Sequence, residues 1–455
     1  MLDERRRPVH TVYGGAHLFT HDVAARLGRA ALRHLDEWAP DFVTFARAVR
    51  LAGSERLPAV TSERRRLVER LAAGGDEARR AEPAATIAFA TYARARERLE
   101  REPVEDFRID FEDGFGFRSD AHEDEHAARV AGELARGLGA GTLPAHVGIR
   151  IKPFTPGSLA RAARTLERLV EALVAATGGR LPEPFLVTLP KVTRAAQVAA
   201  LADCCDALER RHGLRAGALG IEIMIETPES VIGPDGVVPL RGFVQAARDR
   251  CRGVHFGAYD YTAACGIAAA HQSLSHPACV FARQVMRTAL AGTEVALSDG
   301  AVTLLPVGPH RAPDGSPPAA REREANRAAV HEGWRVHFEE VRRALREGFD
   351  QGWDLHPAQL VTRHAAVVSY YLEARDEAAS RFATFVERAA RASRHGSVVE
   401  DAATGQGLLN FFLRALACGA LTEAEALSAG LTLEELRGRS FARIAERRAG
   451  RTPSA

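Results

Sequence analysis

The stretch that decides the fold is residues 220–260, GIEIMIETPESVIGPDGVVPLRGFVQAARDRCRGVHFGAYD. It opens on an apolar run, GIEIMIET, that carries Glu226 near its end, and it closes on a second run, GVHFGAYD, that ends at Asp260. Short runs rich in Ile, Val and Phe predict buried β-strands. Two such strands joined by a crossover segment predict neighbouring parallel strands of one sheet.

The same alternation continues on both sides of this stretch. The chain contains eight candidate strands, at residues 11–17, 107–113, 146–153, 185–192, 220–227, 253–260, 301–307 and 353–357. Arginine-rich amphipathic patterns, for example at 158–176 and 195–211, lie between most of them. Eight strands with helical crossovers favour a closed (β/α)8 barrel, the TIM barrel of the α/β class, over an open sheet.

Two parts of the chain exceed a minimal barrel. A long helical insertion at 38–102 follows the first strand, and a long helix at 358–392 follows the eighth and leads into further short helices. We therefore predict a TIM-barrel catalytic domain at 1–375, which includes the insertion, and a C-terminal helical extension at 376–455.

Composition excludes several classes of function. The formal net charge is only +2, from 61 basic and 59 acidic residues, so no nucleic-acid partner is implied. No run of 18 apolar residues occurs, and the N-terminal MLDERRRPVH has no apolar core, so we expect neither a membrane span nor a signal peptide. The six cysteines form no CxxC pair, which is typical of reduced thiols. These features predict a cytoplasmic protein.

Charged side chains stand at the predicted carboxyl ends of the strands, where barrels of this kind carry their active sites. In strand order they are Asp110, Glu112, Asp113, Arg150, Lys152, Lys191, Glu226, Asp260 and His356. Charges at the end of an apolar strand are costly unless they are paired or solvated. Carboxylates suit a hard divalent cation, and arginine clamps a carboxylate through two hydrogen bonds. The set therefore predicts a site for a divalent cation and an anionic substrate.

The three central residues also allow structural interpretations. Glu226 could form a salt bridge at the barrel mouth, Asp260 could cap the next helix, and Arg150 could simply neutralise the acids. Lys191 could in principle form a Schiff base. The carboxylates at neighbouring strand ends favour a protonated Lys191 that binds substrate or orients a carboxylate.

The remaining candidates also have alternatives. Glu112 and Asp113 are adjacent, and adjacent strand residues face opposite sides, so spacing allows only one of them to face the barrel interior. His356 precedes Pro357 and is also typical of a structural residue at a strand end.

Eight segments together resemble the family of the citrate lyase β-subunit and the HpcH/HpaI aldolases, within the phosphoenolpyruvate/pyruvate-binding barrels. They are FEDGFG, EDEHAARV, GIRIKP, LPKV, IETPESV, FGAYDYTAACG, LSDGAV and GFDQGWDLHPAQL. They occur in the family's order over residues 107–362. The departures are Tyr259 where the family has an acid, Pro228 and Glu229 after the glutamate, and the absence of recognisable loops for coenzyme A. This chain is therefore identified as a divergent member.

The resemblance implies a carbon–carbon lyase that cleaves or condenses an oxo or hydroxy acid, or its coenzyme A thioester, through an enolate. Glu226 and Asp260 would hold Mg²⁺ or Mn²⁺, and Arg150 would be catalytic, binding the acid and polarising its oxygen. Lys191, Glu112, Asp113 and His356 would complete the substrate site. The protein would be a homo-oligomer.

Related enzymes take a carboxylate from a C-terminal segment that covers the site. Asp401, in the segment SVVEDAATGQG, is the matching candidate for the general base, although it could equally cap the helix that begins near Gly407. Two other functions stay open. One is phosphoryl transfer from phosphoenolpyruvate, for which the sequence offers no GxxxxGK[ST] loop. The other is a non-catalytic barrel subunit.

Overall fold

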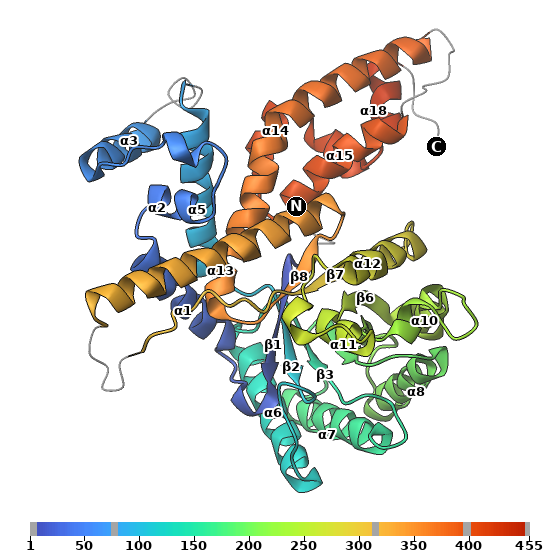
Figure 1. Ribbon diagram of the computed structural model, residues 1–455. Coiled ribbons are helices and arrows are strands. Elements are labelled where there is room, and N and C mark those ends of the chain that lie inside the picture. Colours follow the sequence, from blue (N-terminus) through green and yellow to red (C-terminus); the bar gives the residue numbers. More distant parts are fainter. Residues whose placement is uncertain (1–6, 74–80, 312–317, 395–401, 451–455) are drawn as a thin grey trace. The chain divides into compact units, whose positions relative to one another are not determined.

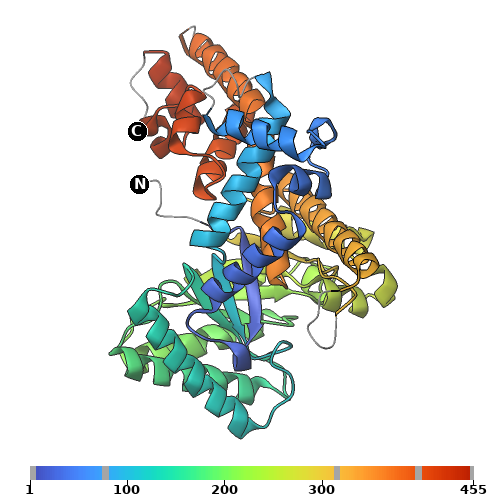
Figure 2. The same ribbon diagram turned by 90° about the vertical axis from the view of Figure 1, so that its left-hand side faces the viewer.

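The computed structural model describes residues 7–73, 81–311, 318–394 and 402–450. Eight parallel strands close into a barrel in chain order, as predicted, and helices surround them (Figures 1 and 2). The strands are β1 (His10–Gly15), β2 (Asp106–Asp110), β3 (His146–Arg150), β4 (Phe185–Leu189), β5 (Leu219–Ile225), β6 (Cys251–Phe256), β7 (Ala296–Ala301) and β8 (Gln351–Asp354). The α/β barrel fold class is therefore confirmed.

Helices account for most of the rest of the described chain. Those before β5 are α1 (Val23–Trp38), α2 (Phe42–Ala48), α3 (Thr61–Ala73), α5 (Pro83–Arg101), α6 (Asp120–Ala140), α7 (Leu159–Thr177) and α8 (Ala195–His212). Those after it are α9 (Pro228–Val231), α10 (Leu240–Ala246), α11 (Ala258–Ala264), α12 (Pro277–Ala289), α13 (Ala320–Arg346), α14 (Pro357–Arg394), α15 (Ala402–Ala417), α16 (Glu423–Ser428), α17 (Leu433–Gly438) and α18 (Phe441–Arg448). No helix within the described ranges is long and apolar enough to cross a membrane.

The chain divides into two compact units. Among the described residues, the barrel unit contains 8–40, 96–311 and 318–363, and the helical unit contains Arg7, 41–73, 81–95, 364–394 and 402–450. Within the helical unit, Phe382 of α14 packs edge-on against Phe412 of α15, with ring centroids 6.4 Å apart. The domain boundary at residue 375 stays a prediction.

The predicted position of the seventh strand, 301–307, is wrong. The strand is β7, and the apolar run VTLLPV follows it as irregular chain in which Leu304 is 47% exposed. A buried charged residue explains why the sequence pattern does not predict β7 at its observed position. Asp299 of β7 accepts a hydrogen bond from Arg283 of α12 (Nη1–Oδ2 2.9 Å), so the strand carries an acid where an apolar residue would be expected.

The barrel interior is polar at its centre. Arg108 of β2 donates from Nε to Glu222 of β5 (2.7 Å), and Thr188 of β4 donates to the same carboxylate (2.7 Å). Strands β2 and β5 are not neighbours in the sheet, so the bond between Arg108 and Glu222 crosses the interior. Burial alone would raise the pKa of Glu222, but Arg108 and His255 hold it well below its usual value. The carboxylate of Glu222 in this layer is therefore ionised and paired with Arg108.

A second buried cluster joins strands to the surrounding helices. Asp354 at the end of β8 receives hydrogen bonds from Arg363 of α14 (Nη2–Oδ1 2.8 Å) and contacts His337 of α13 (Nε2–Oδ1 3.0 Å). His10 of β1 lies 2.8 Å from its other oxygen. Burial would raise the pKa of Asp354, but Arg363, His10 and His337 hold it well below its usual range. The ionised carboxylate therefore fixes β1 and β8 to the helices outside them.

Substitution of Asp354 by Asn should destabilise the protein by about 3 kcal/mol, because breaking a buried ion pair leaves an uncompensated charge on Arg363. Chemical denaturation at neutral pH measures the loss. The control is Asp36→Asn at an exposed pair with Arg96, where the change should stay below about 1 kcal/mol. Equal losses of unfolding free energy in the two variants would show that Asp354 does not form a stabilising buried ion pair with Arg363.

Candidate active site

Arg150, at the end of β3, lies at the centre of the site. Its Nε donates to Asp110 Oδ1 (2.7 Å) and its Nη2 donates to the other carboxylate oxygen, so the end of β2 clamps the guanidinium edge-on. The same carboxylate accepts the backbone N–H groups of Glu112 (2.9 Å) and Gly114 (2.7 Å). A Cβ at position 114 would lie 2.6 Å from Asp110 Oδ2, so glycine is required there. One carboxylate thus fixes both Arg150 and the loop after β2.

Glu112 and Asp113 lie in that loop and face the same two cations. Arg150 Nη1 is 3.3 Å from Glu112 Oε2 and 3.7 Å from Asp113 Oδ2. Lys191 Nζ donates to Glu112 Oε1 and lies 3.4 Å from Asp113 Oδ1. The expectation that only one of the two acids could face the site is wrong, because β2 ends at Asp110 and strand alternation does not extend to the loop.

Lys191 follows β4 in a turn where its own φ is +52°, and it contacts the site through two groups. Its backbone N–H donates to Glu226 Oε1 (2.6 Å), and its Nζ lies 3.8 Å from Asp260 Oδ2. Burial alone would lower the pKa of Lys191, but Glu112 and Asp113 raise it above its usual value. A protonated amine argues against a Schiff base and favours a role in binding or orienting anions.

Glu226 follows β5 and is almost completely buried. Burial, with a further contribution from the charge of Asp260, raises the pKa of Glu226 to about 8, although Arg150 and Lys191 oppose the shift. A Cβ at Gly257, after β6, would lie 2.5 Å from Glu226 Cβ and 2.6 Å from Oε2. Glycine at 257 therefore leaves room for this carboxyl group between β5 and β6.

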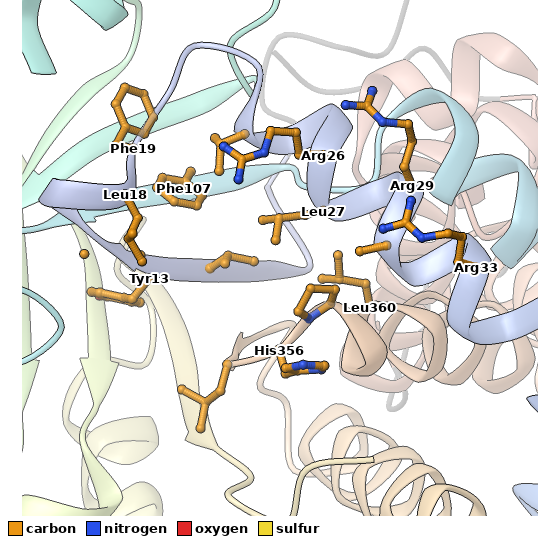
Figure 3. A pocket seen from close by; sticks show the side chains of 17 residues that line it. Tyr13, Leu18, Phe19, Arg26, Leu27, Arg29, Arg33, Phe107, His356 and Leu360 are labelled. Atoms are coloured by element: carbon orange, nitrogen blue, oxygen red, sulfur yellow. The ribbon is translucent and has the colours of Figure 1, made fainter. Parts of the chain in front are cut away.

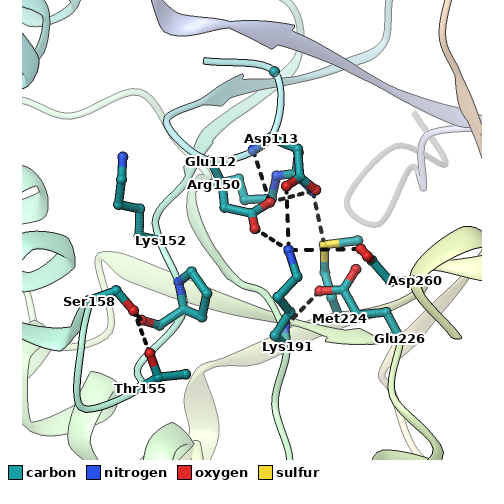
Figure 4. A network of polar contacts seen from close by, with 12 residues as sticks. Glu112, Asp113, Arg150, Lys152, Thr155, Ser158, Lys191, Met224, Glu226 and Asp260 are labelled. Carbon is teal, nitrogen blue, oxygen red and sulfur yellow. Dashed lines mark hydrogen bonds and ion pairs between the residues drawn. The ribbon is translucent and has the colours of Figure 1, made fainter. Parts of the chain in front are cut away.

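Asp260 lies in the first turn of α11, and its side chain is 46% exposed. The N-cap of α11 is Gly257, so the alternative interpretation of Asp260 as a helix cap is wrong. Figure 4 shows Lys191 between the carboxyl groups of Glu112 and Asp113 on one side and of Glu226 and Asp260 on the other.

The charges of the site favour a bound cation. Five carboxyl groups, those of Asp110, Glu112, Asp113, Glu226 and Asp260, gather around the two cations Arg150 and Lys191. Burial raises the pKa of Glu112 as well as that of Glu226, although Arg150 and Lys191 oppose the shift of both groups. Within the described ranges no group of three or more His, Cys, Asp or Glu side chains is arranged to enclose a metal. The donors present fit a cation that completes its shell with water and substrate, as Mg²⁺ does.

Two other candidates, Lys152 and His356, have partners outside the carboxyl cluster. Lys152 pairs with Glu123 of α6 (2.6 Å) and donates to the carbonyl of Phe111 (2.8 Å), which ties the loop after β2 to its helix. His356 Nδ1 accepts the N–H of Ala358 (3.1 Å) at the start of α14, so the structure does not bring it to the carboxyl cluster. Asp401 lies outside the described residues.

His356 instead lines a cavity of about 430 Å³ between α1, β1 and the chain after β8. Apolar side chains such as Leu27 and Leu360 form much of its lining (Figure 3). Arg29 and Arg33 lie along α1 at its edge. Tyr13 of β1 also lines this cavity, and the centroid of its ring lies 5.0 Å from the guanidinium carbon of Arg150.

Tyr13 and Trp353 are the site residues that the sequence analysis missed. Both rings contact the Arg150 guanidinium, at 5.0 and 5.7 Å from their centroids. The alternation of side chains between the two faces of a strand could have identified both residues. Tyr13 follows Thr11 by two residues, and Trp353 follows Gln351 by two, so each pair shares one face of its strand. Thr11 and Gln351 bond each other inside the barrel (2.6 Å), which places the two aromatic rings there as well.

The fold and the site together define a (β/α)8-barrel protein with an acid-rich mouth around one arginine and one lysine. The chain belongs to the family described as "Domain of unknown function (DUF6986)", which matches residues 3–444. A comparison with the sequences of curated proteins finds no match.

Solved structures similar to this chain include two malate synthase complexes from Haloferax volcanii and the citrate lyase beta subunit from M. tuberculosis. The malate synthase ternary complex with pyruvate and acetyl-CoA is 16% identical, with a TM-score of 0.41 over 57% of this chain and 60% of that one, less than two thirds of its length. The lead(II) complex of malate synthase is 16% identical, with a TM-score of 0.42 over 76% and 89% of the two chains. The citrate lyase beta subunit, complexed with oxaloacetate and magnesium, is 20% identical, with a TM-score of 0.38 over 61% and 93%.

Magnesium should raise the melting temperature more at pH 8 than at pH 6. Because the pKa of Glu226 is raised to about 8, ionising this group opposes folding as the pH rises from about 4.5 to 8, and a cation would remove that cost. Below pH 8, protons should weaken Mg²⁺ binding by up to about tenfold per pH unit. Thermal melts with and without Mg²⁺ at the two pH values measure the difference.

Glu226→Gln should abolish this pH-dependent gain, whereas Glu229→Gln, at an exposed acid of α9, should keep it. The same gain at both pH values in the unsubstituted protein would contradict the role of Glu226.

Proposed function

We propose that this protein is a Mg²⁺- or Mn²⁺-dependent carbon–carbon lyase that cleaves or condenses an oxo or hydroxy acid, or its coenzyme A thioester, through an enolate. The observation that carries the proposal is the buried carboxyl of Glu226 beside Asp260, facing the cations Arg150 and Lys191. Such a site combines ligands for a hard cation with donors for an anionic substrate.

Glu226 and Asp260 would hold the cation. Two carboxylates leave most of an octahedral shell to water and substrate oxygens. When bound, the cation supplies positive charge beside a carbonyl oxygen that becomes an enolate.

Arg150 would bind the carboxylate or oxo group of the substrate. Asp110 occupies its Nε and Nη2 and leaves Nη1 on the side of Glu112 and Asp113. Because the clamp fixes the guanidinium before substrate arrives, little ordering remains when an anion binds. Lys191 would supply a second positive charge and hold Glu112 and Asp113 in place.

The proposed proton acceptor is Asp401, on the basis of the sequence resemblance alone. It would take a proton from the carbon next to the carbonyl in the condensation direction and return it after cleavage. The proposed substrate contact of His356 belongs to the cavity in Figure 3 rather than to the carboxyl cluster.

Purified protein with Mg²⁺ or Mn²⁺ should release pyruvate or acetyl-CoA from one of oxaloacetate, a 4-hydroxy-2-oxo acid, malyl-CoA or citryl-CoA. Glu226→Gln should reduce kcat/KM on the order of 10²–10³-fold, since it removes charge stabilisation in the transition state. Glu229→Gln is the matched control and should stay within about threefold of the unsubstituted enzyme. If Glu226→Gln leaves turnover unchanged, the assignment of Glu226 as a metal ligand is wrong. Nucleotide-dependent release of phosphate from phosphoenolpyruvate would instead favour a phosphotransferase.

Substitutions in the cavity lined by Tyr13 can test whether the substrate is a free acid or a thioester. Its apolar lining and the cations Arg29 and Arg33 suit an extended chain that carries phosphates. If the substrate is a thioester, Arg29→Ala combined with Arg33→Ala should raise KM by about tenfold while kcat is retained. Steady-state kinetics measure both constants. An unchanged KM for the thioester would show that the phosphate-bearing chain of the substrate binds outside this cavity.

A further inference from the structure

Arg150 contacts two aromatic rings that come from other strands of the barrel. It starts from β3, whereas Tyr13 is on β1 and Trp353 on β8. The guanidinium carbon lies 5.0 Å from the Tyr13 ring centroid and 5.7 Å from that of Trp353. The two rings pack against each other at 4.3 Å, tilted by 40°. A guanidinium within about 6 Å of an aromatic face is attracted by the ring, more strongly when water is excluded.

Different residues contact the different nitrogens and the plane of the Arg150 guanidinium. Asp110 takes the hydrogens of Nε and Nη2, and the rings of Tyr13 and Trp353 pack against the group. Nη1 lies 3.7 Å from the sulfur of Met224 and otherwise faces the acids of the loop after β2. The Asp110 carboxylate holds one edge of the guanidinium, and the two rings pack against the rest of the group.

The hydroxyl of Tyr13 contacts a buried histidine in the barrel interior. The hydroxyl oxygen lies 3.0 Å from His255 Nδ1, and His255 Nε2 lies 3.3 Å from Glu222 Oε1. Glu222 in turn is held by Arg108. Burial, and then Glu222, raise the pKa of Tyr13 well above its usual value, so the phenol stays neutral and can donate to His255. The hydroxyl of Tyr13 therefore faces the polar layer in the barrel, while its ring faces Arg150.

We propose that Tyr13 and Trp353 are positioning residues that hold Arg150 with Nη1 directed at the substrate anion. The inference rests on the proposed function, because it assigns Arg150 to anion binding. It goes beyond that function by assigning the rings, rather than the Tyr13 hydroxyl or the Asp110 clamp alone, to the aim of the guanidinium. It predicts that loss of either ring weakens anion binding and leaves cation binding unchanged.

The test uses oxalate, a small dianion, with Mg²⁺ and isothermal titration calorimetry on the full chain. Tyr13→Leu and Trp353→Leu should each raise the oxalate Kd about tenfold or more, with the Mg²⁺ Kd unchanged. Tyr13→Phe and Trp353→Phe keep a ring and should stay within about threefold. Phe256→Leu, which removes a buried ring that packs against Tyr261, is the control for loss of an aromatic side chain and should bind oxalate normally.

Fluorescence gives a second measurement that needs no leucine variant to fold. Oxalate should change the emission of the unsubstituted protein, and Trp353→Phe should remove that change, because Trp353 lies against the arginine that the anion contacts. An unchanged oxalate Kd in Tyr13→Leu, an equal loss in Tyr13→Phe, or no emission change on oxalate binding would each overturn the proposal.

The two proposals fail separately. If the protein turns over an acid and Tyr13→Leu keeps the kcat/KM of the unsubstituted enzyme, the positioning role is wrong and the lyase function stands. If no acid is turned over but oxalate binding depends on the two rings, the lyase function is wrong and the positioning role stands.

Discussion

The ion pair between Asp110 and Arg150 is the interaction on which the rest of the site depends. Both side chains are buried, so neither charge is tolerable without the other. Asp110 also holds the backbone of the loop that carries Glu112 and Asp113, and those acids in turn engage Lys191. A single carboxylate at the end of β2 therefore arranges groups from β3, β4 and its own loop.

The barrel and the approximate site were predictable because both depend on patterns local to each strand. Apolar runs mark seven of the eight strands to within a few residues, and the carboxyl ends of parallel strands meet at one rim. That geometry alone predicts that Arg150, Lys191, Glu226 and Asp260 approach one another, and the contacts of Lys191 agree. The metal and its substrate remain proposals.

Features that depend on contacts between distant strands were not predictable. β7 was misplaced because Asp299 is stabilised by Arg283, a partner that local pattern does not identify. The orientation of Glu112 and Asp113 depends on where β2 ends, and in the loop beyond that end the Asp110 side chain accepts the backbone N–H groups of Glu112 and Gly114. Tyr13 and Trp353 appear in sequence as ordinary core aromatics, and only closure of β1 against β8 brings them to Arg150.

The central claim is that Glu226 and Asp260 share one divalent cation. Anomalous diffraction from crystals grown with Mn²⁺ tests it most directly. A cation shared by Glu226 and Asp260 should give one peak at the barrel mouth, about 2.0–2.3 Å from a carboxylate oxygen of each residue, and Glu226→Gln crystals should lose it. A peak at other residues, or no peak at the mouth of a well-ordered barrel, would contradict it.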